Sequence, residues 1–249
     1  MPLTYAIGDI HGRRDLLETL LAAIRADMGD RDARIIFLGD IIDRGPESRQ
    51  CLDLVILTLE RHPGSKLILG NHEEFMLDFL DAATTAEHET AAHRWLPNGG
   101  SETLMSYGFA DTVGFDAIAR QLADDVPDHI ATLREANWMV ESDGHVFVHG
   151  GIDPHLPLAE QDPKTTRWIR EKFLKFTGPL PKIVVHGHTM TDASLPELYR
   201  NRIALDTGAV RSGHLTCGIF DGDTPPRFLA TDDHGRAIEV SEIRALDYR

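Results

Sequence analysis

The feature that most constrains the fold is a series of short apolar runs, each followed by glycine and polar residues. The runs are rich in Ile, Val, Leu and Phe and are bounded by turn-forming residues, which is typical of buried β-strands. Such strands need cover on both faces, so they predict an α/β architecture. The runs are Leu3–Ile7, Arg34–Leu38, Lys66–Leu69, His145–Val148, Ile183–Val185, Arg202–Leu205 and Leu215–Phe220.

Helical patterns separate the first three runs. Asp15–Ala26 and Ser48–Leu59 carry apolar residues at three- and four-residue spacing, which is typical of amphipathic helices. This alternation predicts parallel βαβ units early in the chain. The later runs are closer together, which favours antiparallel pairing, so we expect a mixed sheet.

The segment from Glu73 to Val140 has a different, helical pattern. No Ser- or Pro-rich linker marks either end, so we expect a helical insertion (about 73–140) in a single domain over 1–249. A further helix is predicted at Thr165–Phe176, and a hairpin and loop from Pro225. The helices expected in the insertion are Glu73–Ala83, Gly99–Tyr107, Phe115–Leu122 and Pro127–Asn137.

Composition limits the classes of partner. With 25 Lys+Arg against 40 Asp+Glu, the formal net charge is −15, which argues against stable nucleic-acid binding. Phosphorylated substrates remain possible, because bound metal ions reverse the field inside a cleft. Two cysteines, Cys51 and Cys217, indicate a reduced, cytoplasmic setting. No signal-like or membrane-spanning stretch occurs, so we expect a soluble protein with no membrane partner.

The predicted strands end in the residues that carry chemistry. Because sites assemble at the carboxyl ends of strands in open α/β sheets, five such ends can meet at one edge. Oxygen and nitrogen ligands without thiolate favour manganese, iron or zinc over a purely hard magnesium or calcium cage. Two such ions about 3.5–4 Å apart clamp a phosphoryl group and activate a bridging water for in-line attack. The candidate metal ligands are Asp9, His11, Asp40, Asn71, His149 and His188.

Four further residues fit the rest of a phosphoryl-transfer reaction. Arg44 and Arg170 are planar cations suited to binding phosphate oxygens. His72, as an imidazolium, could protonate a leaving alkoxide, and Asp43 could hold it in place and keep it charged.

Each motif also has a purely structural interpretation. Asp40 to Gly45 could be a helix-capping turn, and Asn71 could be the N-cap of a helix with Glu74 at N3. Occurring together, each after a strand, the motifs favour the functional interpretation. Two other polar groups are predicted to be solvated: His88 and His93 on a polar helix, and Asp232, Asp233 and His234 in the tail.

The strings Gly-Asp-x-His-Gly, Gly-Asp-x-x-Asp-Arg-Gly and Gly-Asn-His-Glu, in this order, resemble those of metallophosphoesterases of the phosphoprotein phosphatase family. The resemblance is closest to the small bacterial and phage serine/threonine protein phosphatases. It runs from Gly8 to about Phe220. Its later parts are Trp95–Gly100, His149, Trp168–Glu171, Gly187–Thr189 and Asp206–Ala209.

The resemblance implies a calcineurin-like metallophosphoesterase fold, a mixed β-sandwich flanked by helices. It implies two divalent metal ions, Mn²⁺ first, with Fe or Zn as alternatives. His186 shares strand phase with His188, and the resemblance favours His188 because the family's ligand follows glycine. The implied roles are as follows: Asp9, His11 and Asp40 hold one ion; Asp40, Asn71, His149 and His188 hold the other; Asp43 and His72 are the acid pair; Arg44 and Arg170 bind phosphate.

The implied activity is hydrolysis of phosphomonoesters, with phosphoserine and phosphothreonine in proteins first and phosphotyrosine also open. A symmetrical diadenosine tetraphosphatase, or another nucleotide or RNA-end phosphatase, is the alternative within the fold. Those tetraphosphatases typically have Ala where Asp43 stands and Asp where Glu73 stands, which favours the protein phosphatase. A non-catalytic phosphate-binding scaffold is the third possibility, disfavoured because every proposed catalytic position is filled.

Overall fold

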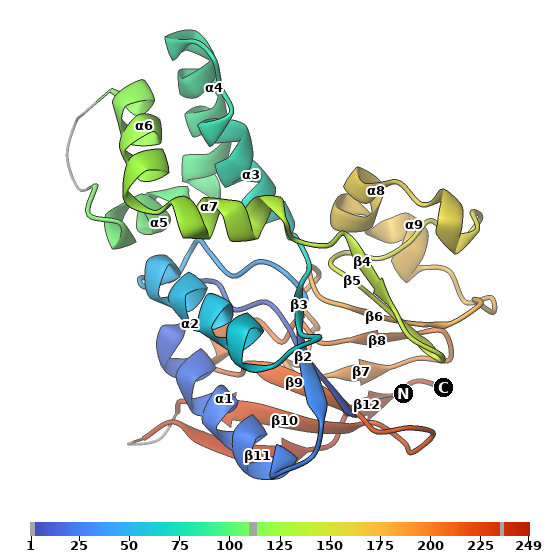
Figure 1. The fold of residues 1–249 in the computed structure, drawn as a ribbon. Helices are drawn as coiled ribbons and strands as arrows, with labels where there is room; N and C mark the ends of the chain where they lie inside the picture. Colours follow the sequence, from blue (N-terminus) through green and yellow to red (C-terminus); the bar gives the residue numbers. More distant parts are fainter. Residues whose placement is uncertain (1–2, 110–113, 235–236) are drawn as a thin grey trace.

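The computed structural model describes residues 3–109, 114–234 and 237–249, and in them the chain forms two mixed sheets with helices outside (Figure 1). The strand orders are β11-β10-β9-β1-β2-β3 and β12-β7-β8-β6-β5-β4. The strands are β1 Leu3–Ile7, β2 Ala33–Phe37, β3 Lys66–Leu67, β4 Met139–Glu141, β5 His145–Val148, β6 Ile183–His186, β7 Glu197–Leu198, β8 Arg202–Ala204, β9 Thr216–Phe220, β10 Arg227–Asp232, β11 Glu239–Ile243 and β12 Leu246–Asp247. The α-helices are α1 Arg14–Met28, α2 Ser48–Arg61, α3 Asn71–Leu80, α4 Thr85–Trp95, α5 Gly100–Ser106, α6 Phe115–Asp125, α7 Pro127–Arg134, α8 Pro163–Trp168, α9 Glu171–Leu174 and α10 Ala209–Ser212.

Alternate residues of the central strands β1 and β2 face two different cores, which accounts for the layers of the fold. Tyr5 and Phe37 pack into the core that contains the buried face of α1, whereas Ala6 and Ile36 pack against residues of the second sheet. Both faces of these strands are therefore buried, which is why they read as continuous apolar runs. Phe173 of α9 covers the outer face of the second sheet. The predicted mixed β-sandwich flanked by helices is confirmed.

The early βαβ units are as predicted, but the later pairing differs. β1 and β2 are parallel, with Leu3 opposite Ala33, and β2 and β3 are parallel as well. The later strands β5, β6 and β8 also run parallel, where we expected antiparallel neighbours. The prediction is wrong for these three strands because α8 and α9 carry the chain back between β5 and β6, as a crossover requires. It is confirmed for β9, which pairs antiparallel with β1 and β10.

Helices α3 to α7 follow β3 and stand together at one end of the sandwich (Figure 1). The first turn of α4 is fixed by a capping box between Thr84 and Glu87. His88 of this helix is buried against Phe79, so the prediction that it is solvated is wrong, whereas His93 is exposed. Within the described residues, no helix combines the length and apolar character needed to cross a bilayer.

Two predicted helix boundaries are wrong at places that matter for the site. The helix expected at Thr165–Phe176 is interrupted at Ile169 and Arg170, whose backbones leave the helical region between α8 and α9. Helix α3 is capped by Gly70 rather than Asn71, so Glu73, not Glu74, occupies position N3. In both cases tertiary contacts outweigh local helix propensity.

Candidate metal and phosphate site

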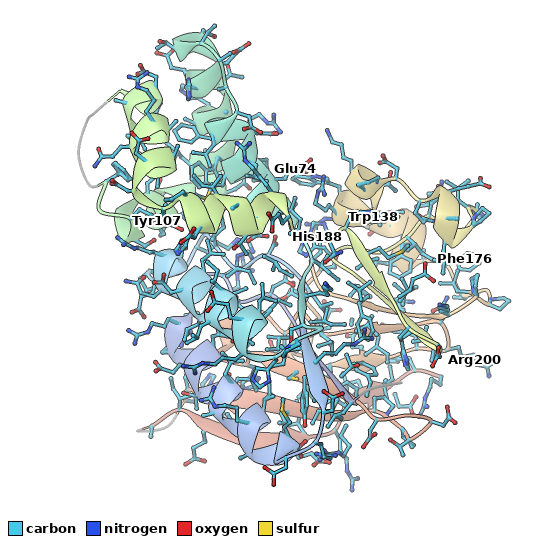
Figure 2. The ribbon with its side chains drawn as sticks, in the orientation of Figure 1. Glu74, Tyr107, Trp138, Phe176, His188 and Arg200 are labelled. Carbon is cyan, nitrogen blue, oxygen red and sulfur yellow. The ribbon has the colours of Figure 1, made fainter. Side chains whose placement is uncertain are left out.

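A cleft of about 640 Å³ opens at the end of the sandwich next to the helices α3 to α7. Figure 2 shows His188 where these helices and α8 approach the sheets. Three arginines line the cleft, each from a different part of the chain: Arg44, Arg170 and Arg211. The cleft therefore presents positive charge to solvent in a strongly acidic protein, as an anion-binding site requires.

Two sets of possible ligand atoms meet at this cleft and share one carboxylate. His11, Asp40 and His72 form one set, and Asp40, His149 and His188 form the other, with the atoms of each set within 4.8 Å of one another. His149 Nε2 lies 3.3 Å from Asp40 Oδ1, and His11 Nε2 lies 3.6 Å from Asp40 Oδ2. Asp40 is the ligand that two ions would share if both sets were occupied.

The two remaining predicted ligands lie next to these sets. Asn71 Oδ1 is 3.0 Å from His149 Nε2, so the amide faces the second set. Asp9 belongs to neither set, and its carboxylate accepts the backbone N–H of His188 at 3.0 Å. Gly187 allows this approach, because a Cβ there would lie 2.0 Å from Asp9 Oδ1.

Backbone carbonyls orient the imidazoles. His11 Nδ1 donates to Ile42 O at 2.8 Å and His149 Nδ1 donates to Leu38 O at 2.7 Å, so Nε2 of each ring faces Asp40. His188 Nε2 is buried and has no hydrogen-bond partner among the described residues. A buried nitrogen in that state can accept a ligand, and the imidazole and carboxylate donors around it fit transition-metal dications.

His186 lies outside both ligand sets. Its ring packs edge-on against Phe173, and burial lowers the pKa of His186 to about 4.

The carboxylates buried at the site need compensating positive charge when they are ionised. Burial, together with Asp206 and Asp40, raises the pKa of Asp9 well above its usual range. Burial and Asp40 likewise raise the pKa of Asp206 to about 6. Burial acts in the same direction on Asp40, but His149 and His72 outweigh it and hold its pKa well below the ordinary value. Burial lowers the pKa of His188 to about 2, so its ring is neutral and available as a ligand.

His72 and Asp43 form a buried hydrogen-bonded pair. His72 Nδ1 lies 2.7 Å from Asp43 Oδ2, and Asp43 also accepts from Trp95 Nε1 at 3.0 Å and Thr103 Oγ1 at 2.6 Å. Burial raises the pKa of Asp43. Burial by itself would lower the pKa of His72, but the carboxylates of Asp40 and Asp43 outweigh it, and the pKa is raised. Arg44 reaches the same ring, with Nη2 2.9 Å from His72 Nε2.

Several residues of the site also have strained backbone conformations. His11, Asp40, Asp43, Arg44 and His188 all have positive φ, between 49° and 74°. Such conformations cost about 1–2 kcal/mol each for residues other than glycine, so the surroundings must enforce them.

The turn at Gly99 is one of the contacts that enforce this geometry. The Gly99 carbonyl accepts the N–H of Arg44 at 3.1 Å. A Cβ on Gly99, whose φ is 109°, would lie 2.5 Å from Arg44 N. The turn at Gly99, within the segment Trp95–Gly100 that carried part of the resemblance, therefore lies at the cleft and shapes it through its backbone.

Glu73 organises the loop that carries Asp40. Its fully buried carboxylate accepts the backbone N–H groups of Asp40 (2.8 Å), Ile41 (2.7 Å), Ile42 (3.2 Å) and Gly70 (2.9 Å). Burial and the nearby Asp40 raise the pKa of Glu73 to about 7. Sequence reasoning missed this role, although a Glu at N3 that accepts the N–H of the N-cap residue is one half of a capping box.

Replacement of Glu73 by Gln is expected to lower stability by about 2–4 kcal/mol, because an amide presents N–H donors to backbone N–H groups and leaves them unsatisfied. Thermal unfolding of the metal-free protein measures this loss. The exposed Glu60→Gln is the matched control and should leave the midpoint unchanged. An unchanged midpoint in Glu73→Gln would show that these hydrogen bonds contribute nothing to stability.

Sequence reasoning noted Trp95 and Asp206 only as parts of the resemblance, without a role, and missed Thr103 and Arg211. Trp95 and Thr103 reach Asp43 from α4 and α5, and Asp206 and Arg211 reach the cleft from the segment around α10. Asp206 follows the predicted strand Arg202–Leu205, whereas no spacing pattern in the sequence connects Trp95, Thr103 or Arg211 to the strand ends.

Comparisons with known proteins agree on a family and differ on substrate. The family model described as calcineurin-like phosphoesterase matches residues 3–200. The symmetrical bis(5'-nucleosyl)-tetraphosphatase of Janthinobacterium sp. (strain Marseille) is 32% identical over 71% of this chain, and the match spans only 52% of that enzyme's own length. Serine/threonine-protein phosphatase 1 of Salmonella typhimurium is 26% identical over 85% of this chain and 89% of its own.

Solved structures agree on the fold alone. A cold-active protein-tyrosine phosphatase of a psychrophilic Shewanella species superposes with a TM-score of 0.59 over 98% of this chain and 81% of its own, at 17% identity. A metallophosphoesterase from Sphaerobacter thermophilus gives a TM-score of 0.50 over 98% of this chain and 89% of its own, at 16% identity.

Proposed function

We propose that this chain, which belongs to the calcineurin-like phosphoesterase family, hydrolyses phosphomonoesters of serine and threonine in proteins with two divalent metal ions. The observation that carries the proposal is the buried pair of Asp43 and His72, 2.7 Å apart. The phosphorylated protein is the expected partner, and manganese is the expected metal.

The chemistry of the leaving group connects this pair to the substrate class. A serine or threonine alkoxide is strongly basic and must be protonated as it departs. A nucleotide released from a phosphoanhydride is a far better leaving group and needs no such proton. His72 lies between Asp43 and Asp40, and a proton carried on its imidazole would suit an alkyl ester.

The described residues fit two metal ions and a phosphoryl group. Divalent ions would polarise the phosphoryl oxygens and supply a nucleophilic water at neutral pH. Arg44 and Arg170 line the cleft and would orient the phosphate oxygens. The residues that would hold the ions are Asp9, His11, Asp40, Asn71, His149 and His188.

Phosphate release by one manganese-loaded sample tests the proposal. A phosphothreonine peptide and diadenosine tetraphosphate are compared at equal concentration, and a higher kcat/KM on the peptide is expected. Preference for the dinucleotide would contradict the assignment of substrate while keeping that of a phosphoesterase. No release from either substrate, or from an aryl phosphate, would favour a phosphate-binding scaffold.

A symmetrical dinucleoside tetraphosphatase is the second candidate, favoured by Arg211. This arginine lines the cleft, is exposed, and has no ion pair among the described residues. With Arg44 and Arg170 it makes a third cation, which suits a ligand that carries anionic groups beyond the scissile phosphate.

Arg211→Ala distinguishes the two candidates. If the cleft accepts a polyphosphate chain, KM for diadenosine tetraphosphate should rise about tenfold, the effect of losing one charge-assisted contact of about 1.5 kcal/mol, while KM for an aryl monophosphate changes little. The exposed Arg200→Ala is the matched control. Equal effects on both substrates would contradict a role in binding additional phosphates.

A further inference from the structure

A cluster of metal-type side chains lies outside the cleft. His214, Asp232 and His234 place three ligand atoms within 4.8 Å of one another, and none of the three lines the cleft. From sequence, the tail residues Asp232 and His234 were predicted only to be solvated. The structure adds a partner from a distant segment, His214, which comes directly after the loop that ends α10.

The pairing of two strands fixes this arrangement. β9 and β10 are antiparallel, with Thr216 opposite Ala230. The same register, continued by two residues, sets His214 opposite Asp232, and the bond from Thr231 N to Leu215 O at 3.1 Å holds the strands together there. Directly opposed residues project from the same face of a sheet. The approach of His214 and Asp232 therefore follows from backbone pairing.

The chemical state of His214 suits a ligand. Its Nδ1 donates to Ser194 O at 3.2 Å, which leaves Nε2 as a lone-pair donor 4.0 Å from Asp232 Oδ1. A backbone carbonyl behind the ring is the usual outer partner of a metal-binding histidine. His234 Nδ1 lies 3.0 Å from the same carboxylate oxygen. The neighbouring Asp233 is engaged by Arg13 at 2.6 Å, so the carboxylate of Asp232 is the one facing both rings.

We propose that His214, Asp232 and His234 form a peripheral binding site for a transition-metal dication such as Zn²⁺, Cu²⁺ or Ni²⁺. Two imidazoles and one carboxylate match the preference of these ions, whereas Ca²⁺ and Mg²⁺ require more oxygen ligands. His214 is partly buried whereas Asp232 and His234 are exposed, so water would complete the coordination. A bound ion would link His214, in the segment that follows α10, to Asp232 and His234 at the end of β10. The site is independent of the proposed phosphatase activity.

Cu²⁺ is the probe, because it binds nitrogen and oxygen ligands most tightly among the common divalent ions. The full chain, saturated with Mn²⁺, is titrated with Cu²⁺, and bound copper is followed by its visible d–d absorption and by elemental analysis. Wild type is compared with His234→Ala and with His214→Ala/His234→Ala. The exposed His155→Ala is the matched control. Copper that enters the catalytic centre contributes equally to all four proteins, so the difference between them isolates the peripheral site.

Wild type and His155→Ala should bind one equivalent of Cu²⁺ more than the double variant, with a d–d absorption band typical of nitrogen ligation accompanying that extra equivalent. His234→Ala should weaken the extra binding about tenfold or more, because one ligand is lost. Equal copper content and identical spectra in wild type and the double variant would overturn the proposal. Melting curves in chelator establish that the variants are folded, and His234→Gln provides the same test should the double variant fail to fold.

Discussion

Asp40→Asn is expected to remove both metal ions and to lower kcat by about three orders of magnitude or more, since bound metal ions supply several kcal/mol of transition-state stabilisation. Asp40 is the one carboxylate shared by both ligand sets. Asparagine tolerates the positive φ of 52° at this position, so the backbone turn should survive and the effect should come from the lost charge.

Elemental analysis after dialysis against Mn²⁺ gives the metal content per chain, and phosphate release gives the activity. Asp223→Asn, at an exposed position, is the control and should retain full metal and full activity. Full metal occupancy in Asp40→Asn would rule out the bridging role.

His72→Asn should slow hydrolysis of alkyl phosphates by about 10²–10⁴-fold, the usual contribution of a general acid, and hydrolysis of aryl phosphates by far less. Aryl leaving groups are weakly basic and depart without a proton. Asp43→Asn should also slow hydrolysis of alkyl phosphates more than that of aryl phosphates, but by a smaller factor. The His72 imidazole would lose the carboxylate that orients it and keeps it charged.

Metal content separates the two roles open to His72, whose side chain also belongs to the first ligand set. If His72 is a general acid, the metal content of His72→Asn should equal that of wild type. If His72 is a metal ligand, the metal content should fall. His155→Asn serves as the exposed control. Equal losses on alkyl and aryl substrates, or loss of metal, would contradict the assignment as general acid.

Much of the fold was predictable because strand burial and helix amphipathicity are local patterns. The apolar run Leu3–Ile7 is β1 in the structure, and the amphipathic run from Ser48 is α2. The direction of the later strands was not predictable, since it depends on the crossover through α8 and α9. The break at Arg170 and the burial of His88 likewise arise from contacts with other elements rather than from local propensity.

The sequence by itself determined the identity of the metal-type and phosphate-type side chains and their positions after strands, because parallel βαβ units bring strand ends to one edge. Only the tertiary structure decided which side chains meet. It placed Glu73 under the Asp40 loop, Trp95 and Thr103 behind Asp43, and Arg211 in the cleft. These contacts join residues from separate elements, so their geometry is set by how the layers pack, which no local pattern encodes.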